Sequence, residues 1–138
     1  MPSLPTQKKK LAGTDPFDGC YERYASATAL VKMVSAVDPS LTNGRQIFTN
    51  LEHPEIKEIV SKWIDEIVLG LATLIHIFNP SSIVLGGGIM VQPYILEQIQ
   101  ARVPQMVMSS FAHVQISSAK LGNSAGLLGA YYLASQKL

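Results

Sequence analysis

The sequence contains little cysteine, little charge and no long apolar run. Cys20 is the only cysteine among 138 residues, so no disulfide can form within the chain and a reducing, cytoplasmic setting is expected. Only 15% of the residues are charged and the formal net charge is +1, which argues against direct contact with nucleic acid or an anionic membrane. The most apolar run, residues 67–78, falls short of the ~20 residues that a membrane-spanning helix needs.

Familiar catalytic and metal-binding signatures are also missing. The sequence contains no Walker A loop, no G-x-G-x-x-G, no H-E-x-x-H and no Ser/His/Asp set, so it identifies no general base. Three scattered histidines and one cysteine argue against zinc, which usually takes four ligands. His76 lies in the apolar stretch of a predicted helix, and we expect it to be a packed histidine.

Apolar residues are what the chain has in excess. Hydrophobic residues make up 47% of the sequence, at the length of one ordinary domain. That is more than one small core needs, which predicts that part of the surface meets something else, with a second copy as the expected partner. Residues 1–18 hold prolines and a lysine run, and are predicted to be a tail or a truncated edge.

The pattern of apolar residues predicts alternating helices and strands, an α/β order. A long helix over 53–78 loses its polar face halfway and is expected to enter the interior. The strand at 82–85 is apolar on both faces, which favours a buried, central position. The remaining expected elements are a helix around 25–34, a helix from 93, a strand at 114–118 and a helix at 124–136. Two strands are few, so the rest of the sheet is expected outside this chain.

Three segments are candidates for a ligand site. Gly86, Gly87 and Gly88 directly follow the first strand, where glycines let a nucleotide approach the backbone; the alternative is a tight turn. Glu22 lies in the first turn of a helix, where it could accept hydrogen bonds from ligand hydroxyls or simply favour the helix dipole. Residues 122–126 lead into the last helix, whose small side chains favour close helix packing over phosphate binding.

These segments together resemble the ROK family of bacterial sugar kinases and related repressors. Gly-Cys-Tyr-Glu-Arg-Tyr-Ala-Ser (19–26) is similar to the end of the family signature. Asn-Pro-Ser-Ser-Ile-Val-Leu-Gly-Gly-Gly-Ile (79–89) is similar to its later strand and adenosine-contacting turn. Leu-Gly-Asn-Ser-Ala-Gly-Leu-Leu-Gly-Ala (121–130) is similar to the entry of its C-terminal helix. The order and spacing agree over residues 19–136.

The resemblance implies the C-terminal lobe of an actin-like ATPase fold, related to ribonuclease H, over residues 19–138. It implies ATP with Mg²⁺ as cofactor and a hexose or amino-hexose as substrate in the intact protein. Glu22 would bind sugar hydroxyls, Gly86, Gly87 and Gly88 would admit adenosine, and Cys20 would be the remnant of a zinc site, with zinc itself not expected in this chain.

The family's Asp-x-Gly-x-Thr stretch, its catalytic aspartate and its Glu-x-Gly-His motif have no counterpart in this sequence. We therefore expect a part of an ATP-dependent sugar kinase that is inactive by itself. Two alternatives stay open: the ligand-sensing part of a ROK transcriptional regulator, and a non-catalytic oligomerisation module.

Overall fold

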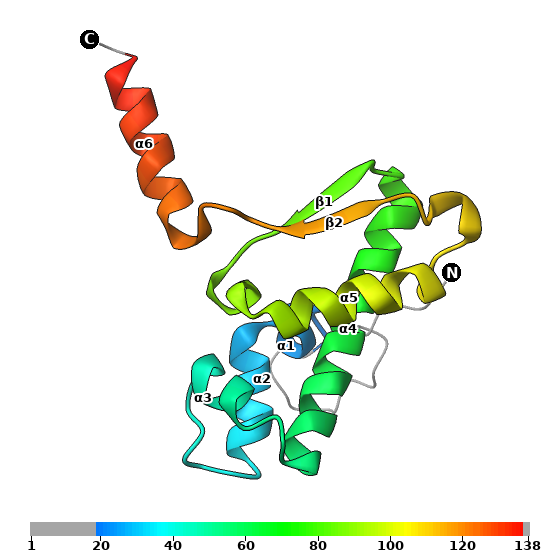
Figure 1. The fold of residues 1–138 in the computed structure, drawn as a ribbon, viewed down its shortest axis with the longest axis vertical. Helices are drawn as coiled ribbons and strands as arrows, with labels where there is room; N and C mark the ends of the chain where they lie inside the picture. Colours follow the sequence, from blue (N-terminus) through cyan, green and yellow to red (C-terminus); the bar gives the residue numbers. More distant parts are fainter. Residues whose placement is uncertain (1–18, 137–138) are drawn as a thin grey trace.

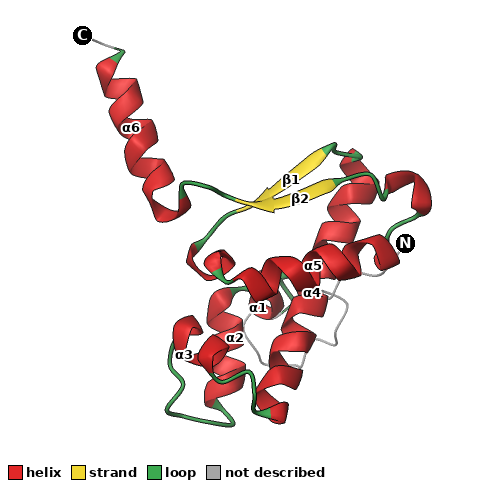
Figure 2. Ribbon diagram, viewed as in Figure 1, coloured by secondary structure: helices red, strands yellow, loops and turns green. Residues whose placement is uncertain are grey.

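The computed structural model describes residues 19–136, so the predicted tail at 1–18 lies outside the described residues. Figure 1 labels the elements and Figure 2 separates helices from strands. The helices are α1 (Glu22–Ala25), α2 (Ala27–Ser35), α3 (Gly44–Thr49), α4 (Pro54–Phe78), α5 (Pro93–Met106) and α6 (Ala125–Ser135). The strands are β1 (Ser82–Leu85) and β2 (Gln115–Ser118), and short 3₁₀ turns are η2 (Gly88–Val91), η3 (Ser109–Phe111) and η4 (Gly122–Ser124).

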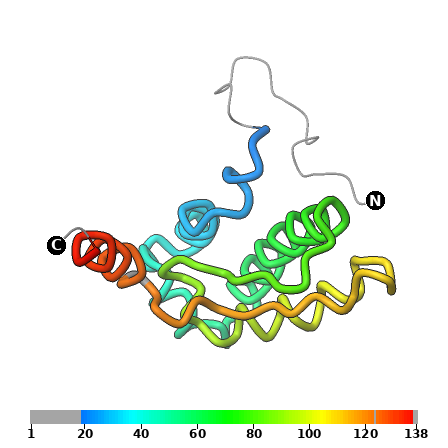
Figure 3. Tube along the Cα trace, turned by 90° about the horizontal axis from the view of Figure 1, so that it is seen from above, coloured from blue at the N-terminus to red at the C-terminus, as the bar shows by residue number. Residues whose placement is uncertain are grey.

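The two strands form a parallel sheet, which confirms the predicted α/β class. Ile83 is in register with Ile116, and α5 makes the connection that parallel strands require. The strands run side by side in both views (Figures 1 and 3). The prediction of a buried, central strand is wrong within the described residues, because Val84 is 64% exposed while Ile83 packs against the core. Among residues 19–136, helices lie only against the face of the sheet that carries Ile83 and Leu85.

The core forms around α4, whose apolar stripe packs against α1, α2 and α5. Trp63 is the largest fully buried side chain of this core. The indole N–H of Trp63 donates a hydrogen bond to the Ser26 carbonyl at 3.0 Å. The Ser26 hydroxyl also accepts a hydrogen bond from the Ala29 N–H at 3.1 Å. Because Ser26 has extended backbone angles and caps α2, it separates α1 from α2 where the spacing of apolar residues indicated no break.

Arg102 on α5 links this helix to α4 through hydrogen bonds and an ion pair. Its guanidinium donates to the Ser61 carbonyl at 2.9 Å, the Ser61 hydroxyl at 3.0 Å, and the Gln98 side-chain oxygen at 2.9 Å. It also forms an ion pair with Asp65 at 2.6 Å. The planar fork of arginine allows these bonds at once, so the crossing of the two helices is defined by directed contacts as well as by packing.

His76 is a satisfied, packed histidine, as its apolar surroundings predict. Its Nε2 accepts the Met108 N–H at 3.3 Å, so Nδ1 carries the proton and donates to the Ala72 carbonyl at 2.7 Å. Its ring lies 5.2 Å from that of Phe111, centroid to centroid. His76 therefore ties the loop between α5 and β2 to the end of α4.

Two apolar surfaces remain uncovered by the described residues. At the end of α4, Ile77 is 60% and Phe78 71% exposed, so the prediction that this half enters the interior is wrong at its last turn. The whole of α6 projects away from the other helices (Figure 1) and buries no side chain. A Cβ at Gly126 or Gly129 would meet no atom within 4 Å, so the close packing predicted for this helix is not made with any described residue.

Candidate functional site

The glycine-rich turn lies at the carboxyl end of β1. Gly87 has a φ of +111°, a conformation that glycine adopts readily and other residues rarely. A Cβ at Gly86 or Gly87 would meet no atom within 4 Å, and both residues are exposed. The turn therefore needs glycine at position 87 for its backbone and leaves open space beside Gly86 and Gly87, as close approach of a ligand requires.

A groove of about 520 Å³ adjoins this turn, within the range of small-molecule sites. It lies between α2, the start of α3 and the η2 turn, with Gly88 on its wall. A Cβ at Gly44 would lie 3.4 Å from the Ile89 side chain, so α3 and η2 are in contact. The lining residues are Ala27, Thr28, Val31, Thr42, Asn43, Gly44, Arg45, Gly88, Ile89, Val91 and Gln92.

The wall of the groove combines apolar surface with hydrogen-bonding groups. Val31, Ile89 and Val91 are apolar, whereas Asn43 and Gln92 carry amides. This mixture suits a flat heterocycle that has polar edges. The contribution of α2 and α3 to this groove could not be predicted from the sequence, because residues so far from the glycines along the chain give no local signal.

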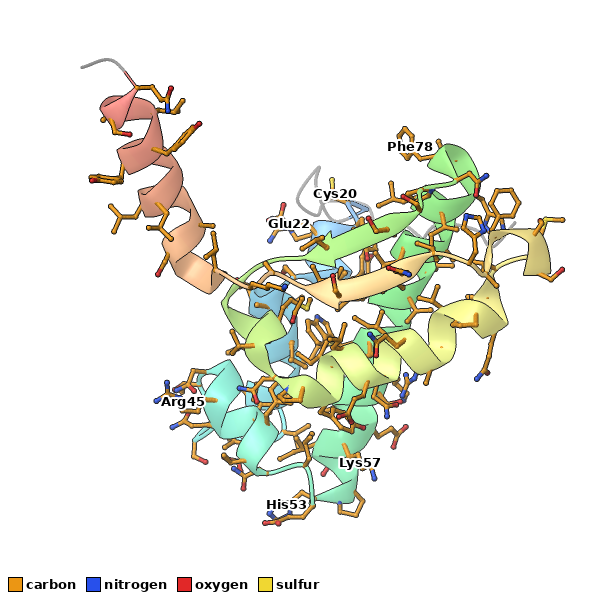
Figure 4. The ribbon with its side chains drawn as sticks, turned by 45° about the horizontal axis from the view of Figure 1, so that its top comes forward. Cys20, Glu22, Arg45, His53, Lys57 and Phe78 are labelled. Carbon is orange, nitrogen blue, oxygen red and sulfur yellow. The ribbon has the colours of Figure 1, made fainter. Side chains whose placement is uncertain are left out.

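A second depression, of about 420 Å³, contains Glu22. It is lined by Cys20, Glu22, Arg23, Ser26, Thr28, Ala29 and Lys32. Thr28 also lines the first groove, so the two hollows adjoin. Figure 4 shows Glu22 and Cys20 together at the start of the described chain, away from Arg45. Glu22 is exposed in the first turn of α1, where its carboxylate is accessible to a ligand.

Tyr21 holds the segment that carries Glu22 against α4. Its hydroxyl donates to the Ile67 carbonyl at 3.3 Å, and its ring lies over Gly70, where a Cβ would overlap the phenol. Burial, with a smaller contribution from the charge of Glu66, raises the pKa of Tyr21 to about 12. Tyr21 is therefore a neutral anchor at ordinary pH.

The segments 19–26 and 79–89 contribute residues to these hollows, whereas segment 121–130 only lies near one of them. The η4 turn at 122–124 contacts η2, so the entry of the last helix adjoins the glycine-rich turn. Gly122 has a φ of +51°, which again favours glycine. Cys20 is exposed, and residues 19–136 contain no group of three or more His, Cys, Asp or Glu side chains arranged to hold a metal ion.

The parallel β-α-β unit, with the glycine-rich turn at the carboxyl end of β1, defines part of an α/β protein. The ROK family model matches residues 4–137, and the chain belongs to this family. None of the helices in the described range combines the length and apolar character needed to cross a membrane.

Curated relatives of the chain include sugar kinases. An uncharacterized protein of Clostridium perfringens is 37% identical over 115 residues, which are 78% of this chain and 39% of the relative. The N-acetyl-D-glucosamine kinase of Yersinia enterocolitica is 25% identical over 84% of this chain and 39% of its own length. A beta-glucoside kinase of Listeria innocua is 36% identical over 64% of this chain and 30% of its own. The chain thus spans about two fifths or less of these relatives.

Solved structures of the family have the same fold. The ROK hexokinase of Thermus thermophilus superposes with a TM-score of 0.73 at 25% identity, covering all of this chain and 47% of that chain. A ROK glucokinase of Streptomyces griseus, solved with glucose and AMPPNP, gives a TM-score of 0.71 at 27% identity, covering 86% of this chain and 45% of the glucokinase. The helices and the small parallel sheet therefore form a portion of the actin-like ATPase fold.

Proposed function

We propose that this chain is the C-terminal part of an ATP-dependent sugar kinase that acts on a hexose or amino-hexose hydroxyl. The observation that carries the proposal is the adjoining of the two hollows, one beside the glycine-rich turn and one beside Glu22, with Thr28 on both. Phosphoryl transfer requires nucleotide and sugar to be held next to each other. Relatives that are named as kinases of glucosides and N-acetylglucosamine support this substrate class.

The groove beside the glycine-rich turn fits a nucleoside. It has the volume of a small-molecule site and apolar walls, and Gly88 of the glycine-rich turn lies on its wall. When bound, ATP with its Mg²⁺ would supply the phosphoryl group. The residues of this chain would hold the adenosine and orient the sugar, while Cys20 is proposed as a zinc-site remnant without a role in catalysis.

No residue of this chain is proposed as the catalytic base. Residues 19–138 are proposed as one lobe, and the aspartate that would deprotonate the sugar hydroxyl belongs to the other lobe of the family fold. We therefore expect the isolated chain to bind nucleotide and sugar weakly and to transfer no phosphoryl group.

Glu22→Gln is expected to weaken sugar binding without changing nucleotide binding. A hydrogen bond to a charged group is worth about 1.5–3 kcal/mol, so we expect KM for the sugar to rise roughly tenfold to a hundredfold. The assay uses a chimera in which residues 19–136 replace the matching segment of the Streptomyces griseus glucokinase. Glu52→Gln, an exposed change outside both hollows, is the matched control. Unchanged sugar kinetics in Glu22→Gln would refute this role.

We further propose that the exposed apolar surface is covered by a second copy of the chain. The side chains involved lie on α6 and are Leu127, Leu128, Tyr131, Tyr132 and Leu133, all between 47% and 76% exposed. A helix that is apolar all round normally lies inside a larger core. Light scattering of the isolated chain should give at least a dimer mass. A strictly monomeric chain at high concentration would contradict the proposal.

A further inference from the structure

We propose that Arg45 contacts the base of the bound nucleotide and so contributes to the choice of phosphoryl donor. The inference rests on the proposed function and goes beyond it by assigning a residue at the opposite end of the nucleotide from the reacting phosphate. The segments that indicated function in the sequence do not include Arg45, which lies on the short helix α3.

Arg45 is the only charged residue on the wall of the groove, among the described residues that line it. Its side chain is exposed and labelled in Figure 4, and it makes no hydrogen bond or ion pair with the described part of the chain. Its place is well defined all the same, because Gly44 contacts Ile89 and Asn43 caps α3 by accepting the Gln46 N–H at 3.0 Å. The backbone of Arg45 is thus held at the groove, and its guanidinium is available for a ligand.

The positions of the two hollows determine which end of a nucleotide Arg45 would meet. The terminal phosphate has to reach a sugar held beside Glu22, and the two hollows adjoin at Thr28. The phosphates therefore extend toward Thr28. Gly88 and Arg45 line the groove but not the Glu22 hollow. The base, at the other end of the nucleotide from the phosphates, would therefore lie against the part of the groove wall that includes Arg45.

The chemistry of arginine suits this end of the ligand. Its guanidinium is planar, is weakly hydrated for a cation and stacks on aromatic faces. Contacts of this kind at exposed sites are worth about 0.5–1 kcal/mol. Converted to affinity, loss of the contact corresponds to a roughly twofold to fivefold rise in Kd. Apolar groups of Val31, Ile89 and Val91 on the same wall would bury the remaining surface of the base.

The test is an NMR titration of the whole chain with adenosine, AMPPNP and ribose 5-phosphate at millimolar concentrations. We expect adenosine and AMPPNP to shift Gly88 and to move the Arg45 Nε–H signal upfield, through the ring current of a stacked base. Arg45→Gln should raise Kd for adenosine and AMPPNP by the same twofold to fivefold factor and leave ribose 5-phosphate unchanged. Lys57→Gln, an exposed change on α4 outside the groove, should alter none of these values.

Two results would overturn the inference while leaving the nucleotide site in place. One is adenosine binding at Gly88 with no response of Arg45 and no effect of Arg45→Gln. The other is an effect of Arg45→Gln on AMPPNP alone, which would assign Arg45 to a phosphate. If neither adenosine nor AMPPNP shifted Gly88 at all, both the inference and the proposed nucleotide groove would fail.

Discussion

Trp63→Ala is expected to unfold the chain or bring it close to unfolding. The substitution removes the largest fully buried side chain of the core, together with the indole hydrogen bond to the Ser26 carbonyl. Truncation of a buried tryptophan costs about 3–5 kcal/mol, against a total stability of about 5–15 kcal/mol for a domain. Urea unfolding followed by circular dichroism measures the change. The midpoint should fall steeply, or no transition should remain.

Two further variants separate the contributions of Trp63. Trp63→Phe keeps much of the buried area but loses the bond to Ser26, so it should destabilise the chain less than Trp63→Ala. Phe78→Ala removes a large aromatic side chain from the end of α4, where it is 71% exposed, and should change stability by no more than about 0.5 kcal/mol. Equal losses from Trp63→Ala and Phe78→Ala would contradict the described core.

Gly70→Ala is expected to destabilise the chain even though alanine favours helices. A Cβ at Gly70 would overlap the phenol of Tyr21, which would have to move and give up its bond to the Ile67 carbonyl. Overpacking of this kind costs about 1–3 kcal/mol, which exceeds the gain of up to about 1 kcal/mol in helix propensity. Because Tyr21 directly precedes Glu22 in the chain, displacement of the tyrosine ring would also move Glu22, the residue proposed to bind the sugar.

A double-mutant cycle tests the Tyr21–Gly70 contact directly. In a Tyr21→Ala background the space is vacated, so the added methyl should be neutral or stabilising in urea unfolding. Gly129→Ala is the matched control, because it makes the same change in a helix where the new Cβ would meet no atom within 4 Å. If Gly70→Ala raised the midpoint in the presence of Tyr21, the described contact would be wrong.

Much of the fold follows from local patterns. The apolar period predicts α4 to within a residue, and the β-branched run before the glycines predicts β1. The burial of those elements cannot be predicted in the same way, because it depends on which other elements pack against them. Val84 and Phe78 are apolar yet exposed, since the described chain holds no element that covers them. Apolar character alone therefore overestimated how much of this chain is interior.

The candidate site likewise has parts that local sequence predicts and parts that depend on tertiary packing. Short segments whose residue types indicate their chemistry predict roles for the glycine-rich turn and for Glu22, and these roles stay predictions. The groove itself could not be predicted, because it forms only where α3 meets η2 beside Gly44 and Ile89, 45 residues apart. Arg45 has no sequence signature for the same reason. Its position is a consequence of tertiary packing.

The central claim, that this chain forms the sugar- and adenosine-binding side of a kinase, is tested most directly by phosphoryl transfer in the chimera with the Streptomyces griseus glucokinase. We measure hexose phosphorylation by ATP for the chimera, for the chimera with Glu22→Gln, and for the isolated chain. The account predicts transfer by the chimera, a marked loss with Glu22→Gln and no transfer by the isolated chain. A folded chimera that transferred nothing to glucose or N-acetylglucosamine would contradict it.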